Sequence, residues 1–445
     1  MIIRFASLAL FCVTALSAAD WPQFGGPNGA KVAMDGHLAR SWPEAGPKKL
    51  WQMPVGLGFA APAVRDGKVY LLDRVATNSD ALRCLDFATG QEEWSLSYDA
   101  PGEFSYPGSR STPAVDDQVV ATIGSFGQVQ CVDKATHQRL WMRSVLASGS
   151  KVKPPRWGVA QSPLLYKDLV IVAPLNSEAS LAAFDKLTGK PVWKAKPLDS
   201  SINSSYTSPM LVNVQGIDQI VMLGQVEDKK DRANLFGVNP ADGTILWTFS
   251  DWGCCIGITQ PLYCGNGFFF LTGGYNANSA LVQVSKQDGA YAVKLIFNGI
   301  GELGYTAPKK ALASDAPPKP GEACSSHLHM PVFFRGCIYA NGNSLQNAAN
   351  GLVCLGLDGL PKWKTGKSVA VEIGDLIVAD DLLVSLSGDG VLRLAEASPA
   401  AYKQLAQARV LEQKKQVWCP LVCVDGRLLV RDDTILKCLD LREQK

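Results

Sequence analysis

The stretch that decides the fold is Asp-Phe-Ala-Thr-Gly-Gln-Glu-Glu-Trp, residues 86–94. Its pattern of an Asp or Asn, a turn and a Trp returns as DKATHQRLW at 133–141, DKLTGKPVW at 185–193 and NPADGTILW at 239–247. Two weaker copies follow, SKQDGAYAV at 285–293 and GLDGLPKW at 356–363. Self-similarity at periods of roughly 40 to 55 residues indicates one structural unit used many times.

Each copy predicts two antiparallel strands joined by a tight turn. The Asp or Asn can accept hydrogen bonds from backbone N–H groups two residues on, and Gly90 tolerates a positive φ. The Trp that ends the second strand suits a flat site between stacked sheets, where its N–H finds a carbonyl. Two residues before the turn the side chain is small, as expected beneath a neighbouring Trp; these positions are Cys84, Cys131, Ala183 and Gly237.

A second hairpin precedes each of these hairpins. It begins with a Pro, continues with a few apolar residues and a turn, and ends in an apolar strand, as in residues 62–70 and 261–268. The other opening prolines are Pro113, Pro163, Pro209, Pro331 and Pro420. Four strands per unit are typical of propeller blades.

The units can be counted along the chain. Seven complete blades are predicted at 59–94, 109–141, 158–193, 205–247, 256–296, 327–363 and 371–411. The last unit, 418–440, lacks its Trp strand, and Lys49-Leu-Trp51 has that form with no hairpin before it. Joining the two ends removes open sheet edges. We therefore predict an all-β, eight-bladed propeller of four-stranded antiparallel blades, closed by the N- and C-terminal strands, with seven blades as the alternative.

One propeller accounts for nearly all of the 445 residues. We expect a single propeller domain at 48–445, preceded by an extended arm at 20–47. Gly and Pro keep the opening stretch of this arm, 21–29, free of regular structure. A long inserted loop, 298–326, interrupts the blades. Loops of this length are often functional or disordered. The net charge of +2 gives no field that favours nucleic acid.

Residues 1–19 are predicted to be a signal peptide. Arg4 is followed by an apolar run and then by Ser17-Ala-Ala19, so cleavage is expected after Ala19. The apolar run is too short to span a membrane. The sequence thus predicts a periplasmic or secreted protein that does not span the membrane.

The joins between blades should gather around the mouth of the central channel, where propeller sites usually lie. Residues expected there as ligand or cofactor contacts are Arg110, Arg156, Trp157, Tyr206, Gln260, Asp375 and Trp418. Adjacent Cys254 and Cys255 lie in the join between blades four and five. They can form a strained vicinal disulfide, remain two thiols or pair with other cysteines.

His327-Leu-His329 is the candidate metal site. Alternation along a strand places both imidazoles on one face, which suits zinc or copper. A third ligand is not evident, so polar channel lining is the competing interpretation. The sequence contains no P-loop, no G-x-S-x-G motif and no dinucleotide-binding fingerprint.

The turn-and-Trp motif resembles the tryptophan-docking repeat of the pyrroloquinoline quinone (PQQ) alcohol dehydrogenases and their relatives. Exported bacterial PQQ-like repeat proteins are similar also in the WPQF–GPNG arm at 21–29, the YPG–RSTP segment at 106–113 and the PRWG loop at 155–158. The same repeat builds the propeller of the outer-membrane assembly lipoprotein, which binds protein rather than quinone. The resemblance therefore indicates the fold more strongly than the cofactor.

For a quinoprotein, the resemblance implies PQQ over an aromatic floor, a base carboxylate, and a calcium ion held by carboxylate and amide oxygens. It also implies that Cys254–Cys255 forms a disulfide ring against the cofactor. Calcium takes 6–8 oxygens. The candidate carboxylates are scattered: Glu103, Asp251, Glu302, Glu372 and Asp375.

Two functions follow from these observations. The first is an exported module that binds a small ligand or an unknown protein partner at the propeller mouth, because the repeat framework is complete but no catalytic set is recognisable. The alternative is a periplasmic PQQ- and calcium-dependent dehydrogenase that oxidises an alcohol or a sugar. The chain lacks the C-x-x-C-H motif of c-type haem, so such an enzyme would pass its electrons to another protein.

Overall fold

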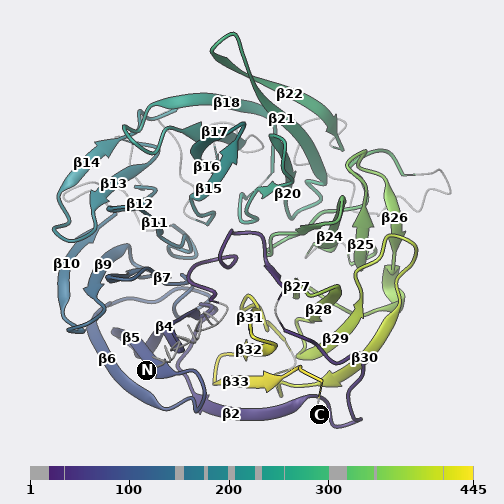
Figure 1. Ribbon diagram of the computed structural model, residues 1–445, viewed down its shortest axis with the longest axis horizontal. Helices are drawn as coiled ribbons and strands as arrows, with labels where there is room; N and C mark the ends of the chain where they lie inside the picture. Colours follow the sequence, from purple (N-terminus) through teal and green to yellow (C-terminus); the bar gives the residue numbers. More distant parts are fainter. Residues whose placement is uncertain are drawn as a thin grey trace, which may run out of the picture.

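The structure is a computed structural model that describes residues 20–443 except 35, 146–154, 175–178, 199–205, 226–232, 255, 300–317, 345–347 and 414. Its strands form eight antiparallel sheets arranged as blades around one axis (Figure 1). The prediction of eight blades is confirmed. The predicted signal peptide, Cys255 and most of the predicted 298–326 loop lie outside the described residues.

The first four blades use strands in chain order. Blade 1 contains β3 (Ala63–Arg65), β4 (Lys68–Ala76), β5 (Ser79–Asp86) and β6 (Glu92–Asp99). Blade 2 contains β7 (Ala114–Val115), β8 (Val119–Ile123), β9 (Gln128–Asp133) and β10 (Arg139–Ser144). Blade 3 contains β11 (Leu164–Tyr166), β12 (Leu169–Val172), β13 (Ala182–Asp185) and β14 (Pro191–Lys194). Blade 4 contains β15 (Met210–Val214), β16 (Ile217–Gln225), β17 (Ala233–Val238) and β18 (Ile245–Trp252).

Three further blades follow the same plan, and the eighth joins the chain ends. Blade 5 contains β19 (Leu262–Tyr263), β20 (Phe268–Thr272), β21 (Ser279–Gln287) and β22 (Ala290–Asn298). Blade 6 contains β23 (Val332–Phe334), β24 (Cys337–Asn341), β25 (Leu352–Leu355) and β26 (Pro361–Lys364), and the short 3-10 helix η1 (Gly366–Ser368) follows it. Blade 7 contains β27 (Asp375–Ala379), β28 (Leu382–Leu386), β29 (Val391–Glu396), β30 (Gln404–Arg409) and the added β1 (Val32–Ala33). Blade 8 contains β2 (Lys48–Pro54), β31 (Val422–Val424), β32 (Arg427–Arg431) and β33 (Ile435–Asp440).

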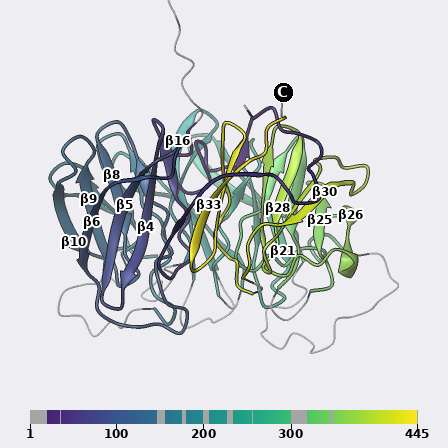
Figure 2. The same cartoon turned by 90° about the horizontal axis from the view of Figure 1, so that it is seen from below.

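Blade 8 closes the ring. Its outer strand β2 pairs with β33, and Trp51 lies opposite Cys438. The first strand of the propeller therefore completes the last sheet, as the sequence predicted. Figure 2 shows the blades from the side, with the C-terminus at one face of the ring. No helix among the described residues is long and apolar enough to cross a membrane.

The repeated Trp links successive blades. The indole Nε1 of Trp141 donates to Lys186 O at 2.8 Å, and that of Trp193 donates to Pro240 O at 3.0 Å. The Trp193 ring covers Gly243, where an added Cβ would meet the ring at 2.6 Å and φ is +76°. The turn glycine is thus required both by its backbone conformation and by the ring above it.

The small strand residue lies beside a Trp, as expected. Cys84 is paired directly opposite Trp94 of its own blade, and an added Cβ at Gly237 would meet the Trp247 ring at 2.4 Å. In blade 2 the turn carries His137 where other turns have Gly, and the Trp94 ring stacks on this imidazole at 4.6 Å. The Trp of one blade therefore packs on the turn of the next blade. The small residue opposite the Trp in its own sheet leaves that face of the indole free for this contact.

The N-terminal arm runs inside the channel. Trp21 bridges antiparallel to Val64 of β3, and Val32 pairs in parallel with Val378 of β27. The chain therefore rises along blade 1, turns between 24 and 30 near the mouth, and descends along blade 7. Figure 1 shows this purple segment crossing the centre of the ring.

Candidate functional site

An aromatic pocket lies at the axial mouth, with a volume of about 190 Å³. Every blade except the seventh contributes through the segment that precedes its first strand, and Phe24 of the arm also lines it. The structure brings together these predicted residues: Arg110, Trp157, Tyr206, Gln260, Trp418, His327 and His329. We call this cavity the axial pocket.

Aromatic rings form the walls of the axial pocket. On one side, Trp418 lies 5.5 Å from Phe59 and 5.6 Å from Tyr106, measured between ring centroids. On another, Trp157 and Tyr206 lie 5.7 Å apart. These rings present flat apolar surface to whatever enters, which suits a ring-shaped ligand.

Several lining residues were missed by sequence reasoning. Phe24, Phe59 and Tyr275 line the pocket but belong to the arm, the first join and the β20–β21 loop. Phe59 precedes the strand-opening Pro62 by a few residues, which was a usable signal. Nothing in the sequence indicated that the arm would enter the channel, because that placement depends on contacts with blades 1 and 7.

The predicted contact Gln260 belongs to a chain of hydrogen bonds that holds three blades together. Ser162 N donates to Ser208 Oγ at 2.8 Å, and Ser208 N donates to Gln260 Oε1 at 2.9 Å. Gln260 Nε2 returns a hydrogen bond to Ser208 O at 2.8 Å. Both polar ends of Gln260 are therefore used within the protein, and its place on the pocket wall is mainly structural.

Arg110 is also engaged by the protein. Its guanidinium donates to Tyr106 O, to Gly108 O at 2.7 Å and to Ser125 Oγ at 3.3 Å. Burial lowers the pKa of Arg110 to about 10, so the group remains cationic at neutral pH. Its N–H groups stabilise the loop that ends at Ser109 more than they serve the cavity.

The floor of the pocket rests on a buried ion pair. Lys31 of the arm donates from Nζ to Asp375 Oδ1, and to Met330 O at 2.9 Å. Asp375 Oδ2 accepts from Leu421 N at 2.8 Å. Asp375 Oδ1 also lies 3.5 Å from His329 Nδ1. Asp375 thus sits behind His329 and does not itself line the axial pocket.

Electrostatics around this pair are set by burial. Burial lowers the pKa of Lys31 and Asp375 opposes that effect. Burial alone would raise the pKa of Asp375, but the Lys31 charge and hydrogen bond bring it below its usual range. Desolvation lowers the pKa of His327 and of His329 to about 4. Both imidazoles are therefore neutral at physiological pH.

The two histidines lie in the loop before β23 rather than on a strand. Alternation therefore does not explain their shared environment. The expectation was wrong because β23 begins only at Val332, after Met330 O accepts from the arm. His327 packs beside Tyr275 at 4.9 Å.

Each imidazole has one ring nitrogen without a hydrogen-bond partner. These atoms are His327 Nδ1 and His329 Nε2, and within the described part of the chain no protein group reaches them. Among the same residues, no group of three or more His, Cys, Asp or Glu side chains could hold a metal ion. The prediction of a metal at this pair has no further support from the geometry.

Two further predicted contacts, Arg156 and Cys254, do not line the pocket. Arg156 is exposed, with its guanidinium 5.3 Å above the Trp157 ring. Cys254 is buried in the apolar cluster that contains Trp252. Its neighbour Cys255 lies outside the described residues, so the vicinal disulfide stays a prediction.

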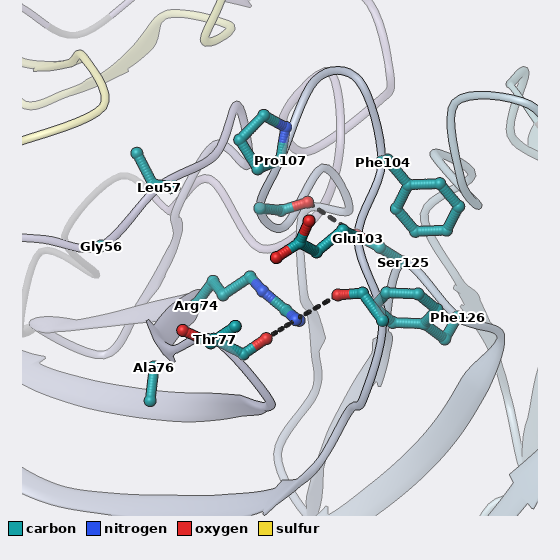
Figure 3. A pocket seen from close by; sticks show the side chains of 12 residues that line it. Gly56, Leu57, Arg74, Ala76, Thr77, Glu103, Phe104, Pro107, Ser125 and Phe126 are labelled. Atoms are coloured by element: carbon teal, nitrogen blue, oxygen red, sulfur yellow. Dashed lines mark hydrogen bonds between the residues drawn. The ribbon is translucent and has the colours of Figure 1, made fainter.

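A second cavity, of about 470 Å³, lies beside the loop between blades 1 and 2 (Figure 3). Its cation, Arg74, donates to Asp80 Oδ1 at 2.9 Å and to the carbonyls of Thr77, Ala100 and Gly102. The Arg74 guanidinium is therefore already hydrogen-bonded to groups of the protein itself. The only carboxylate on its described lining is that of Glu103, which is an exposed residue in a loop. The axial pocket is therefore the stronger candidate.

Comparison with known proteins agrees with the repeat. A family model described as outer membrane protein assembly factor BamB matches residues 80–250. The europium-containing methanol dehydrogenase superposes with a TM-score of 0.67 at 13% identity, covering 93% of this chain and 89% of that one. The chain thus has the propeller fold of these proteins, and residues 80–250 match the family. The chain also resembles BamB from Moraxella catarrhalis, with a TM-score of 0.57 at 12% identity, covering 88% of this chain and 99% of that one.

Curated relatives align with only part of this chain. Quinoprotein alcohol dehydrogenase PedH of Pseudomonas putida is 28% identical over 160 residues, which is 35% of this chain and 24% of PedH. Quinoprotein ethanol dehydrogenase of Pseudomonas aeruginosa is 27% identical over 157 residues, again 35% and 24%. The matched segment therefore spans about a quarter of each relative.

Proposed function

We propose that this PQQ-like propeller binds a small, ring-bearing ligand in the axial pocket and does so without a divalent metal. The observation that carries the proposal is the concave aromatic site at the axis, where Trp418, Trp157 and Tyr206 converge from different blades. Pockets of this kind, mostly apolar with a few placed polar groups, are the usual form of small-molecule sites. Binding at a propeller mouth in the periplasm or outside the cell is consistent with the predicted signal peptide.

Calcium does not fit the residues present. It would need a cluster of carboxylate and amide oxygens. Asp375 is a buried carboxylate that lies beside the pocket residue His329, and Lys31 and Leu421 already occupy its oxygens. Glu372 lies elsewhere, with its carboxylate beside Gly388. Of the other carboxylates considered, Glu302 lies outside the described residues.

A quinoprotein dehydrogenase is the second candidate. Two observations favour it. The named relatives are quinoprotein dehydrogenases, and the aromatic walls of the pocket would accept a planar quinone. PQQ would supply two-electron oxidation of an alcohol if it bound. It is a polycarboxylate, however, and Arg110 is the one cation on the described lining. The donor set of this pocket therefore supports PQQ less well than an uncharged ligand.

Ligand binding can be tested by thermal shift and tryptophan fluorescence. The panel contains PQQ with Ca²⁺, PQQ with EDTA, planar heteroaromatic compounds, and methyl glycosides with cyclic polyols. We expect at least one class to raise Tm and change the fluorescence, with no effect of EDTA. Trp418→Ala should weaken that binding at least about tenfold, because a stacking face is lost.

Trp94→Ala is the matched control, since Trp94 packs between blades 1 and 2 on the outer part of the ring. It should leave the affinity unchanged. If folded protein binds no class in the panel, the proposal is wrong. Binding of PQQ that requires Ca²⁺ would replace it with the dehydrogenase.

A further inference from the structure

We infer that the ligand of the axial pocket is a small planar aromatic molecule with a single carboxylate, and that Arg110 and Tyr206 bind this carboxylate. The inference rests on the proposed function and names the ligand class for the same site. It is carried by a guanidinium on the pocket lining that has no counter-ion among the described residues, and by a phenol on the same lining whose proton is unused there.

The charge of Arg110 is not compensated by any described carboxylate. Asp80 acts on it electrostatically, but Asp80 Oδ1 lies 2.9 Å from Arg74 Nη1 and is paired with that residue. Asp375, beside the pocket, is paired with Lys31. Neutral acceptors take hydrogen bonds from Arg110 but do not neutralise its charge. Because a largely buried cation without a counter-ion is unfavourable, a ligand anion would be stabilising at this place.

Arg110 also has an N–H group left to donate. Among the described residues, protein acceptors take hydrogen bonds from its Nη1 and Nη2 only. Its Nε is not one of the unpartnered polar atoms that the protein seals from solvent. Arg110 is half-buried and lines the axial pocket. The charged guanidinium can therefore donate from Nε to a ligand carboxylate, which is the stronger class of hydrogen bond.

Tyr206 supplies the second donor. Its oxygen accepts from Trp157 N at 3.4 Å, and no described group accepts the phenol proton. Burial raises the pKa of Tyr206, while the hydrogen bond from Trp157 and the charge of Arg110 oppose that rise. The phenol therefore keeps its proton at neutral pH and lies within the field of the guanidinium. An O–H donor beside a cation favours an acceptor that carries negative charge.

The guanidinium is held in position by its own loop. Its Cζ lies 5.5 Å from the centroid of the Phe104 ring, and Phe104 stacks on Phe126 at 4.6 Å between ring centroids. The carbonyls of Tyr106 and Gly108 hold its Nη atoms. A side chain that is already ordered loses little conformational freedom when a ligand binds. The bonds that stabilise the loop therefore also prepare Arg110 for recognition.

The walls and the volume define the rest of the ligand. Trp418 and Phe59 lie 5.5 Å apart, and Trp157 and Tyr206 lie 5.7 Å apart, so aromatic faces are offered on two sides. The volume of about 190 Å³ is below the roughly 300–1,000 Å³ of sites for drug-sized ligands, which favours one or two fused rings. One cation matches one carboxylate. A polycarboxylate such as PQQ would bury charges that no described lining residue compensates.

The test compares aromatic acids with their own amides. Calorimetry on the full-length protein at neutral pH measures binding of indole-3-carboxylate and indole-3-carboxamide, and of quinoline-2-carboxylate and quinoline-2-carboxamide. The members of each pair share their rings and differ in charge. Wild type is expected to bind at least one acid about ten- to a hundredfold more tightly than its amide, which is the effect of a hydrogen bond to a charged group.

Arg110→Gln removes the charge and keeps an amide N–H for the loop carbonyls. It should lower the affinity for the acid to that for the amide and leave the affinity for the amide unchanged, which also shows that the pocket is intact. Tyr206→Phe should weaken binding of the acid about fivefold, the effect of one lost hydrogen bond. Arg335→Gln is the matched control, because Arg335 is exposed in the turn between β23 and β24 and its guanidinium also lies over a Phe ring, at 4.9 Å. It should change neither affinity.

The outcomes separate this inference from the proposed function. Equal binding of acid and amide by wild type, or a preference for the acid that Arg110→Gln retains in full, overturns the inference and leaves the pocket as a ligand site. Tighter binding of PQQ than of every monocarboxylate also overturns it. The comparison in wild type decides the question even if a variant does not fold. Failure of every compound in both panels overturns the proposed function as well.

Discussion

Lys31→Met should destabilise the protein strongly, because it leaves Asp375 charged and unpaired at the centre of the ring. The Lys31 and Asp375 side chains are 4% and 1% exposed, so water cannot replace the lost ammonium. Removing one partner of a buried pair costs about 3–5 kcal/mol. That is a large share of the roughly 5–15 kcal/mol by which native proteins are stable.

The loss of stability in Lys31→Met should depend on the charge of Asp375. Adding Asp375→Asn to the Lys31→Met protein removes the unpaired charge and keeps an oxygen for Leu421 N. The double variant should therefore be more stable than Lys31→Met alone, which is the sign expected for a coupled pair. In the single variant the Asp375 pKa should rise. The loss should therefore be largest near pH 7 and shrink towards pH 4, where the carboxyl is protonated.

Urea unfolding followed by tryptophan fluorescence measures these differences. Lys362→Met is the control, since Lys362 and Asp358 are 45% and 52% exposed and 3.7 Å apart. It should change the free energy of unfolding by less than about 0.5 kcal/mol. A loss below about 1 kcal/mol for Lys31→Met, or a loss that does not vary with pH, would refute the assignment of a buried charged pair.

Other predictions follow from the repeat, the histidines and the proposed ligand. Gly243→Ala should cost about 2–4 kcal/mol, because it combines a positive φ with a clash against Trp193. Gly216→Ala should cost only about 1–2 kcal/mol, because φ is +84° there but no atom lies within 4 Å. If urea unfolding shows equal losses of stability for the two variants, Trp193 does not pack on Gly243 as described. Because His327 and His329 have folded-state pKa values of about 4 against 6.5 when unfolded, their contribution to stability is complete above pH 6.5. It should fall by about 3 kcal/mol per histidine as the pH drops to 4, and substitution of both by Phe should flatten that part of the curve. Neither EDTA nor Ca²⁺ should change Tm with ligand bound, and a dependence on Ca²⁺ in calorimetry would argue against a metal-free pocket.

The fold was predictable because its signals are local and repeated. Each turn and each Trp strand can be recognised within nine residues, and the spacing of the copies gives the blade count. Ring closure followed from Trp51, whose strand had no hairpin of its own. The small residues at Cys84 and Gly237 also follow from the repeat, since each lies opposite the Trp of its own blade.

The site was predictable only in part. Trp157, Tyr206 and Trp418 were found because the joins between blades converge at the mouth. The partner of Asp375 was missed, since Lys31 lies 344 residues away in a segment without regular structure. Contacts of this kind depend on how the arm enters the channel, and no local pattern records that path.

The pairing of β2 with β33 sets an order of events during folding. The chain is synthesised from the N-terminus, so β2 is made before any blade but cannot be paired until Ile435–Asp440 has been made. Pairs so far apart in sequence form slowly. Until then seven blades form an open arc that exposes one face of blade 1 and one face of blade 7. A nascent or truncated chain is thus prone to association, whereas a circular permutant that joins the two ends and opens after β2 would carry blade 8 as one continuous piece.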